Sequence, residues 1–140
     1  MTDTHSEKRL PRPTEATTAY WKGCRQQQLL IQRCKACERL QFYPRSLCTS
    51  CMSGKLEMVP ASGRGTVRTF TVIRHPVSAA YASEVPYALA LIELEEGPTM
   101  MSALCNTDID DVQIGMAVEV VFEQWTDEIT IPKFQAATSP

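Results

Sequence analysis

Four cysteines form two closely spaced pairs in the first half of this 140-residue sequence. Two residues separate Cys34 from Cys37, two separate Cys48 from Cys51, and ten residues lie between the pairs. A two-residue spacing lets a tight turn direct both thiolates at one ion, and two such turns complete the tetrahedron that zinc accepts. The pattern therefore predicts one bound zinc ion, although iron would use the same four ligands.

Two other interpretations of these cysteines are a pair of disulfides and four free thiols. The N-terminal sequence lacks the apolar stretch of a secretory signal, which predicts a cytoplasmic protein with reduced cysteines and favours the metal. No apolar run approaches the ~20 residues that a membrane helix needs. Because protein sulfur fills all four positions, the predicted zinc is structural and leaves no open position for water or substrate.

The remaining candidates for chemistry are isolated residues. Cys24 and Cys105 stand alone, and a catalytic cysteine needs a base. Of the two histidines, His5 lies in the polar N-terminal segment, which leaves His75 as the one plausible partner. The chain also lacks a nucleophile elbow, a P-loop and a dinucleotide fingerprint. We therefore expect no catalytic residue in this chain, and a stand-alone enzyme using Cys105 or His75 is the weakest hypothesis.

The elements that must position the cysteines are short. Tyr20, Trp21 and Cys24 recur at helical spacing within residues 14–25, and short apolar runs over 29–33 and 40–43 predict strands on either side of the first cysteine pair. A segment rich in turn formers, 60–65, is the best internal boundary. We expect a disordered tail over 1–13, a helix over 14–25, a metal-binding ribbon over 26–59, a second domain over 60–134 and a flexible tail over 135–140.

The second domain is expected to be all β. Alternation and β-branched residues predict strands over 66–74, 87–95, 99–104, 117–123 and 129–134, with a helical turn at 108–114. Pro132 restricts the last strand to a sheet edge. Five strands with a short helix between the third and fourth fit a small closed barrel of the OB type. A small open sandwich fits the same pattern.

Charge is distributed unevenly along the chain. Residues 22–74 carry a net charge of +8, whereas residues 75–140 carry −10 with Lys133 as their one base. Such asymmetry is typical of two units or of one unit with two distinct faces. An equally good explanation of the basic half is that its basic residues lie on the solvated surface and compensate the negative charge of the thiolates.

Residues 20–134 resemble the family once described as domain of unknown function 35, in which a rubredoxin-like zinc ribbon precedes an acyl-CoA-associated OB fold. Many members carry a glycine directly after the first cysteine pair, where this chain has Glu38. The resemblance is carried by Tyr20–Gly23, Leu30–Cys37, Tyr43–Arg45, Cys48–Cys51, Ala61–Val67, Phe70–Val72, Pro86–Tyr87, Leu91–Gly97 and Ile114–Met116.

What the resemblance implies is a non-catalytic accessory subunit. Members of this family bind thiolase-superfamily proteins, which would supply the catalytic residues, and help to form the acyl-CoA site of the complex. The helix near Tyr20, the mostly uncharged loop 76–86 and the forked donors of arginines on the first barrel strand are candidate contact surfaces. The expected contacts to the partner or acyl-CoA are Tyr20, Trp21, Arg64, Arg68, Arg74 and Tyr81.

A binding module for single-stranded nucleic acid is the alternative function. An OB fold beside a basic ribbon could stack bases on Phe70 and Tyr87. The presumed barrel is acidic, however, and phosphate affinity requires clustered bases. We therefore expect a thiolase-like partner rather than a nucleic acid.

Overall fold

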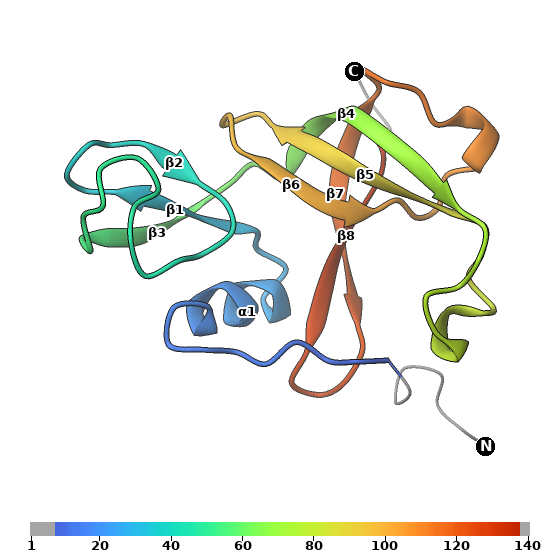
Figure 1. The fold of residues 1–140 in the computed structure, drawn as a ribbon, viewed down its shortest axis with the longest axis horizontal. Coiled ribbons are helices and arrows are strands. Elements are labelled where there is room, and N and C mark those ends of the chain that lie inside the picture. Colours follow the sequence, from blue (N-terminus) through green and yellow to red (C-terminus); the bar gives the residue numbers. More distant parts are fainter. Residues whose placement is uncertain (1–7, 138–140) are drawn as a thin grey trace.

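The structure, a computed structural model, describes residues 8–137 as a small three-stranded sheet and a five-stranded barrel with one helix between them (Figure 1). This mainly β architecture agrees with the expected fold class. No helix within residues 8–137 is both long and apolar enough to cross a membrane. The elements are α1 (Thr18–Arg25), β1 (Leu30–Cys34), β2 (Leu40–Gln41), β3 (Leu56–Pro60), β4 (Arg64–Ile73), η2 (Ala79–Tyr81), β5 (Tyr87–Leu94), β6 (Thr99–Ala103), η3 (Ile109–Asp111), β7 (Ala117–Gln124) and β8 (Thr130–Ala136).

The small sheet, which we call the ribbon, has the strand order β2-β1-β3 with both pairings antiparallel. Arg33 on β1 lies opposite Leu40 on β2 and Glu57 on β3. The third strand, β3, was not predicted, because its residues show no clear alternation and all but the terminal Pro60 are partly buried. Strand β2 is shorter than expected and ends at Gln41, before Phe42.

The barrel has the strand order β6-β5-β4-β7-β8, with every pairing antiparallel. A parallel bridge between Leu104 and Phe134 brings the end strands together, and the Ser102 hydroxyl donates to the Pro132 carbonyl at 3.1 Å. The barrel is therefore nearly closed, and β8 is an end strand, as Pro132 predicts. Gly65 allows β4 to lie close to β5, since a Cβ there would lie 2.6 Å from the carbonyl oxygen of Glu93.

Helix α1 packs between the ribbon and the barrel, where it contacts β1, β7 and β8. Its buried side chains include Tyr20 and Cys24, which lie on the predicted apolar stripe. The helix begins at Thr18 rather than Thr14, because residues 14–17 form a separate turn in which the Thr17 hydroxyl accepts the Thr14 N–H at 2.8 Å.

The structure describes only part of each segment that was expected to be a tail. Residues 1–7 and 138–140 lie outside the described residues. Within the segment expected to be a tail, the Lys8 side chain is only 1% exposed, and β8 continues to Ala136. The N-terminal segment crosses beneath α1 toward the turn between β7 and β8 (Figure 1).

Candidate functional site

The four paired cysteines meet at one end of the ribbon. Cys34 is the last residue of β1, Cys37 lies in the turn before β2, and Cys48 and Cys51 lie between β2 and β3. Their Sγ atoms lie within 4.8 Å of one another, with 3.6 Å between Cys34 and Cys51 and 3.7 Å between Cys37 and Cys48. In a tetrahedron with zinc–sulfur bonds of ~2.3 Å, the sulfurs lie about 3.8 Å apart. The cysteines are therefore positioned to bind one metal ion.

Backbone amides point at two of these sulfurs. The Cys37 N–H donates to Cys34 Sγ at 3.4 Å, and the N–H groups of Ser50 and Cys51 donate to Cys48 Sγ at 3.3 and 3.5 Å. The Cys51 and Ser50 donors lower the pKa of Cys48 to about 6, and the Cys37 donor lowers the pKa of Cys34. The thiolate is the form that binds metal. Zinc held by four thiolates would cross-link the ribbon without supplying a reactive position.

Two buried glutamines hold the loop that carries the second cysteine pair. Gln41 Nε2 donates to Gln32 Oε1 at 2.7 Å across the β1–β2 pair. Gln32 also donates to the Arg45 carbonyl and accepts the Arg45 N–H, both at 2.8 Å, while Gln41 Oε1 accepts the Thr49 N–H at 2.9 Å. Sequence reasoning missed both glutamines, because only the folded register places them opposite each other.

Each cysteine pair is followed by a residue with left-handed backbone geometry. Glu38 has a φ of 67° and Met52 a φ of 68°. Their N–H groups bond to the carbonyls of Cys34 and Cys48 at 2.8 and 3.0 Å, which closes the two turns. Glycine adopts this conformation without a steric penalty. The chain therefore forms both turns with non-glycine residues, at a local conformational cost.

We expect Met52→Gly to raise the free energy of unfolding of the metal-loaded ribbon by about 1 kcal/mol, because a Cβ is disfavoured at positive φ. The Met52 side chain is 67% exposed, so its removal sacrifices little packing. Denaturant titration followed by ribbon amide NMR signals measures the change. Met52→Ala retains the Cβ and is the matched control, and an equal stabilisation by alanine would contradict the explanation.

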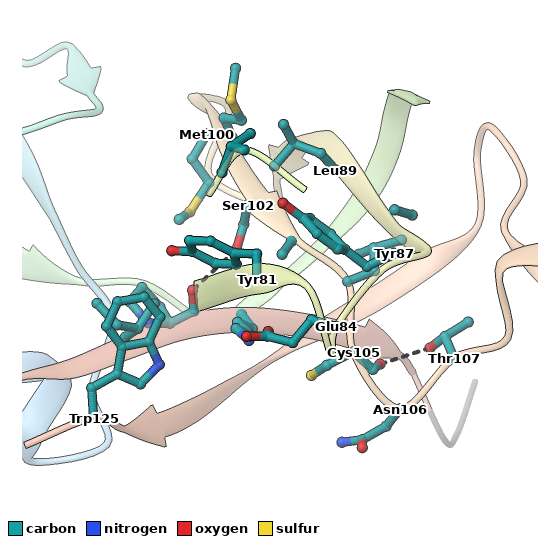
Figure 2. Close-up of a pocket in the computed structure, with 18 of the residues that line it drawn as sticks. Tyr81, Glu84, Tyr87, Leu89, Met100, Ser102, Cys105, Asn106, Thr107 and Trp125 are labelled. Atoms are coloured by element: carbon teal, nitrogen blue, oxygen red, sulfur yellow. Dashed lines mark hydrogen bonds and ion pairs between the residues drawn. The ribbon is translucent and has the colours of Figure 1, made fainter. Parts of the chain in front are cut away.

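A second feature is a groove of about 600 Å³ between α1 and the barrel. Its walls come from α1, the segment after β2, residues 77–87, and strands β5, β6 and β8. Tyr81, Tyr87 and Trp125 are among its aromatic residues, and Ser102 and Cys105 also line it (Figure 2). A concave surface of this size with mostly apolar walls is typical of a ligand site. We call it the aromatic groove.

An aromatic cluster forms the end of the groove nearest the ribbon. The Tyr20 ring lies edge-on to Trp21, Phe42 and Tyr43, with centroid distances of 4.9, 5.6 and 5.4 Å. Burial raises the pKa of Tyr20, which is 2% exposed. Such edge-to-face contacts stabilise the position of α1 against the segment after β2.

A chain of charged side chains includes two residues that line the groove, Glu84 and Lys133. Glu84 pairs with Lys8 and, at 3.6 Å, with Lys133, which pairs with Glu123 at 2.6 Å. Glu123 accepts the Trp125 indole N–H at 3.2 Å, and the Lys8 ammonium lies 4.8 Å from the centre of the Trp125 ring. Sequence reasoning missed Lys8 and Glu84. For Lys133 there was one indication in the sequence, because it is the single lysine or arginine of the acidic half, residues 75–140.

The residues expected to contact a partner or acyl-CoA fall into two groups. Tyr20, Trp21 and Tyr81 line the aromatic groove. The arginines at 64, 68 and 74 are exposed and lie outside its lining. A register shift between Val67 and Thr69 interrupts the alternation on β4 next to Arg68.

The two solitary cysteines show no sign of activation. Cys24 is fully buried in the core, and its pKa is raised by burial to about 11. Burial also raises the pKa of Cys105, which lines the groove. Nucleophilic cysteines have lowered pKa values, and His75 is exposed on the segment after β4. These positions favour packing over catalysis.

Two family models match the chain in tandem. The model described as the ChsH2 rubredoxin-like zinc ribbon domain matches residues 21–57, and the model described as the ChsH2 C-terminal OB-fold domain matches residues 58–123. These matches confirm the expected combination of ribbon and OB fold, and the expected family resemblance.

Several named proteins are similar to this chain. A DUF35 domain-containing scaffold protein of Pyrococcus furiosus is 38% identical over 73% of this chain and 74% of that protein. A probable enoyl-CoA hydratase alpha subunit of Thermomonospora curvata is 36% identical over 91% of this chain, which spans only 40% of that longer protein. Benzoylsuccinyl-CoA thiolase subunit BbsA of Geobacter metallireducens is 33% identical over 77% of this chain and 65% of that subunit.

Solved structures share the whole two-part arrangement. The structure described as the Ltp2-ChsH2(DUF35) aldolase has a TM-score of 0.81 at 33% identity and covers 90% of this chain and 98% of the matched chain. A Sulfolobus solfataricus protein from the DUF35 family has a TM-score of 0.62 at 17% identity and shares the fold.

Proposed function

We propose, because the chain belongs to the DUF35 family of paired zinc-ribbon and OB-fold proteins, that it is a non-catalytic subunit that binds a thiolase-superfamily enzyme and helps to form its acyl-CoA site. The observation that carries the proposal is the 98% coverage of the matched chain in the Ltp2-ChsH2(DUF35) aldolase. The matched chain of that structure thus has the same combination of ribbon and barrel as this protein. Relatives named as a scaffold protein and as a thiolase subunit support the same role.

The chemistry of the chain supports a structural role for its metal. Four sulfurs that converge on one point leave zinc no position for substrate. The thiol nearest the groove, Cys105, has a raised pKa and is poorly suited to attack a thioester. The nucleophile and base of the reaction would then belong to the partner.

Exposed apolar side chains at the groove suggest where the partner binds. Val77 is 74% exposed, Met101 63% and Tyr43 36%, and all three are among the residues that line the groove. Exposed apolar side chains gathered around a concavity are typical of interaction sites. We infer that the partner covers this rim and that the groove forms part of the shared acyl-CoA channel.

The nucleic-acid alternative receives less support. Its two stacking residues were Phe70 and Tyr87. Phe70 packs against the hydrophobic core, and Tyr87 lies in the groove with its ring centre 6.5 Å from that of Tyr81. A base-stacking site also needs a positively charged groove along the phosphate backbone, whereas residues 75–140 carry a net charge of −10.

Co-purification with a thiolase-superfamily protein from the same organism tests the role. We expect one complex of defined stoichiometry in gel filtration at micromolar concentration. Met101→Glu should weaken that complex more than tenfold, because it places a charge on the proposed apolar rim. Ile114→Glu is the control, since Ile114 is 69% exposed and lies outside the groove lining. Separate elution of the two wild-type proteins would exclude the proposed role.

A further inference from the structure

We propose that the aromatic groove binds the acyl group of an acyl-CoA thioester, as an uncharged and mainly apolar group with a carbonyl oxygen, rather than the phosphorylated end of the coenzyme. The inference rests on the proposed function and adds which chemical part of the ligand this chain contacts.

The first argument is the size and chemistry of the walls. A cavity of about 600 Å³ lies within the range of small-molecule sites and exceeds the space of a few waters. Aromatic and aliphatic side chains, including Tyr87, Leu89 and Met100, dominate the lining (Figure 2). Transfer of apolar surface into such a site is favourable by roughly 25 cal/mol per Å². The walls therefore favour an apolar group.

The second argument is that the charged side chains in the groove wall, Glu84 and Lys133, are paired with each other and with the neighbouring Lys8 and Glu123. Lys133 pairs with Glu123 and Glu84, and Lys8 pairs with Glu84. The cluster has two positive and two negative groups, so its formal charge is balanced. Arg64 and Arg68 on β4, and Arg74 directly after this strand, are exposed and lie outside the lining of the groove. Among the described residues the groove therefore offers no unpaired cation to a phosphate, which needs charged donors.

The third argument is a buried donor without a partner. The Trp21 indole nitrogen is buried, and no hydrogen-bond acceptor contacts it within the described part of the chain. Trp21 also lines the groove. A buried N–H that lacks a partner costs about 1–3 kcal/mol, and a ligand carbonyl oxygen would remove that penalty. The donor thus favours a ligand that carries a hydrogen-bond acceptor within its apolar part.

Fluorescence titration of the zinc-loaded full chain tests the proposal without the partner. The probe is Prodan, which is neutral and carries one ketone, and diphenylhexatriene is the matched probe without an acceptor. We expect Trp21→Phe to weaken Prodan binding about three- to tenfold, the worth of one hydrogen bond, while diphenylhexatriene binding changes less than twofold. Ala103→Trp and Met101→Trp, which fill the groove from β6, should reduce the affinity for both probes more than tenfold.

Competition identifies the part of the thioester that binds. Octanoyl-CoA is expected to displace Prodan at concentrations at which CoA without an acyl group does not. Equal displacement by CoA, no binding of Prodan, or an unchanged affinity after both groove-filling substitutions would overturn the proposal. Because these titrations need no partner, their failure is distinct from a failure of complex formation. The Met101→Trp variant is expected to fold, since the Met101 side chain is 63% exposed and little packing depends on it.

Discussion

Replacing Cys37 with serine is expected to release the metal and to unfold residues 26–58 while the barrel remains folded. The part of the ribbon that carries the cysteines has little regular structure of its own, since β2 contains only Leu40 and Gln41. In small zinc domains the metal contributes about 10–16 kcal/mol of apparent binding free energy, and its loss unfolds them. The barrel, by contrast, buries its own core residues, including Ile92 and Phe134. Zinc content by mass spectrometry and hydrogen exchange of ribbon amides measure the two effects.

The control for this prediction is Cys105→Ser. Cys105 lies at the groove and outside the group of sulfurs that could hold the metal. The control variant should keep one zinc per chain and wild-type protection of the Arg33 and Gln41 amides. A Cys37→Ser protein that is metal-free and yet protects these amides would show that the ribbon does not depend on the ion.

The ribbon and its metal site were predictable because the determinants are local. Two residues between cysteines define a turn, and the order of the pairs is visible in the chain without knowledge of any long-range contact. Strand β3 was missed because its pairing partner, β1, lies more than twenty residues earlier and compensates for its weak alternation. The glutamine pair that holds the second cysteine turn was missed for the same reason, since Gln32 and Gln41 meet only once β1 and β2 are paired.

The barrel strands were predicted from alternation, but the surface of β4 was not. The register shift after Val67 changes which residues face inward, so Phe70 packs against the core. A bulge of this kind leaves no reliable mark in a single sequence. The expectation that Phe70 could stack a base therefore assumed an exposure that the folded strand does not give it.

The groove was the least predictable feature, because it combines residues from both ends of the chain. Lys8 belongs to a polar segment with no periodicity, and only the folded structure places it between Tyr81 and Trp125, 4.9 and 4.8 Å from their ring centres. Burial of a lysine is unusual unless the charge is paired, and its partner Glu84 comes from a loop 76 residues away in the sequence. Such long-range charge compensation has no local signature.

Lys133→Met should produce the second large effect, a loss of about 2 kcal/mol from the free energy of unfolding at pH 7. Removing one partner of a buried ion pair costs about 3–5 kcal/mol, and the figure here is smaller because the side chains of Glu123 and Glu84 remain 34% and 30% exposed. The variant leaves both carboxylates near each other with Lys8 as the remaining cation of the cluster. Urea unfolding followed by Trp fluorescence measures the loss.

The pH dependence separates this charge effect from simple loss of packing. Desolvation raises the pKa of Glu123, but the hydrogen bond and charge of Lys133 outweigh it, so the pKa lies below its usual value. The stabilisation is therefore present above the ordinary glutamate pKa of about 4.3 and is lost as the pH falls through the lowered value. The difference between wild type and Lys133→Met should shrink below about pH 4, and adding Glu123→Gln to the variant should recover stability at pH 7. A difference that stays constant from pH 7 to pH 3 would instead assign the loss to packing of the lysine stem, because packing does not titrate.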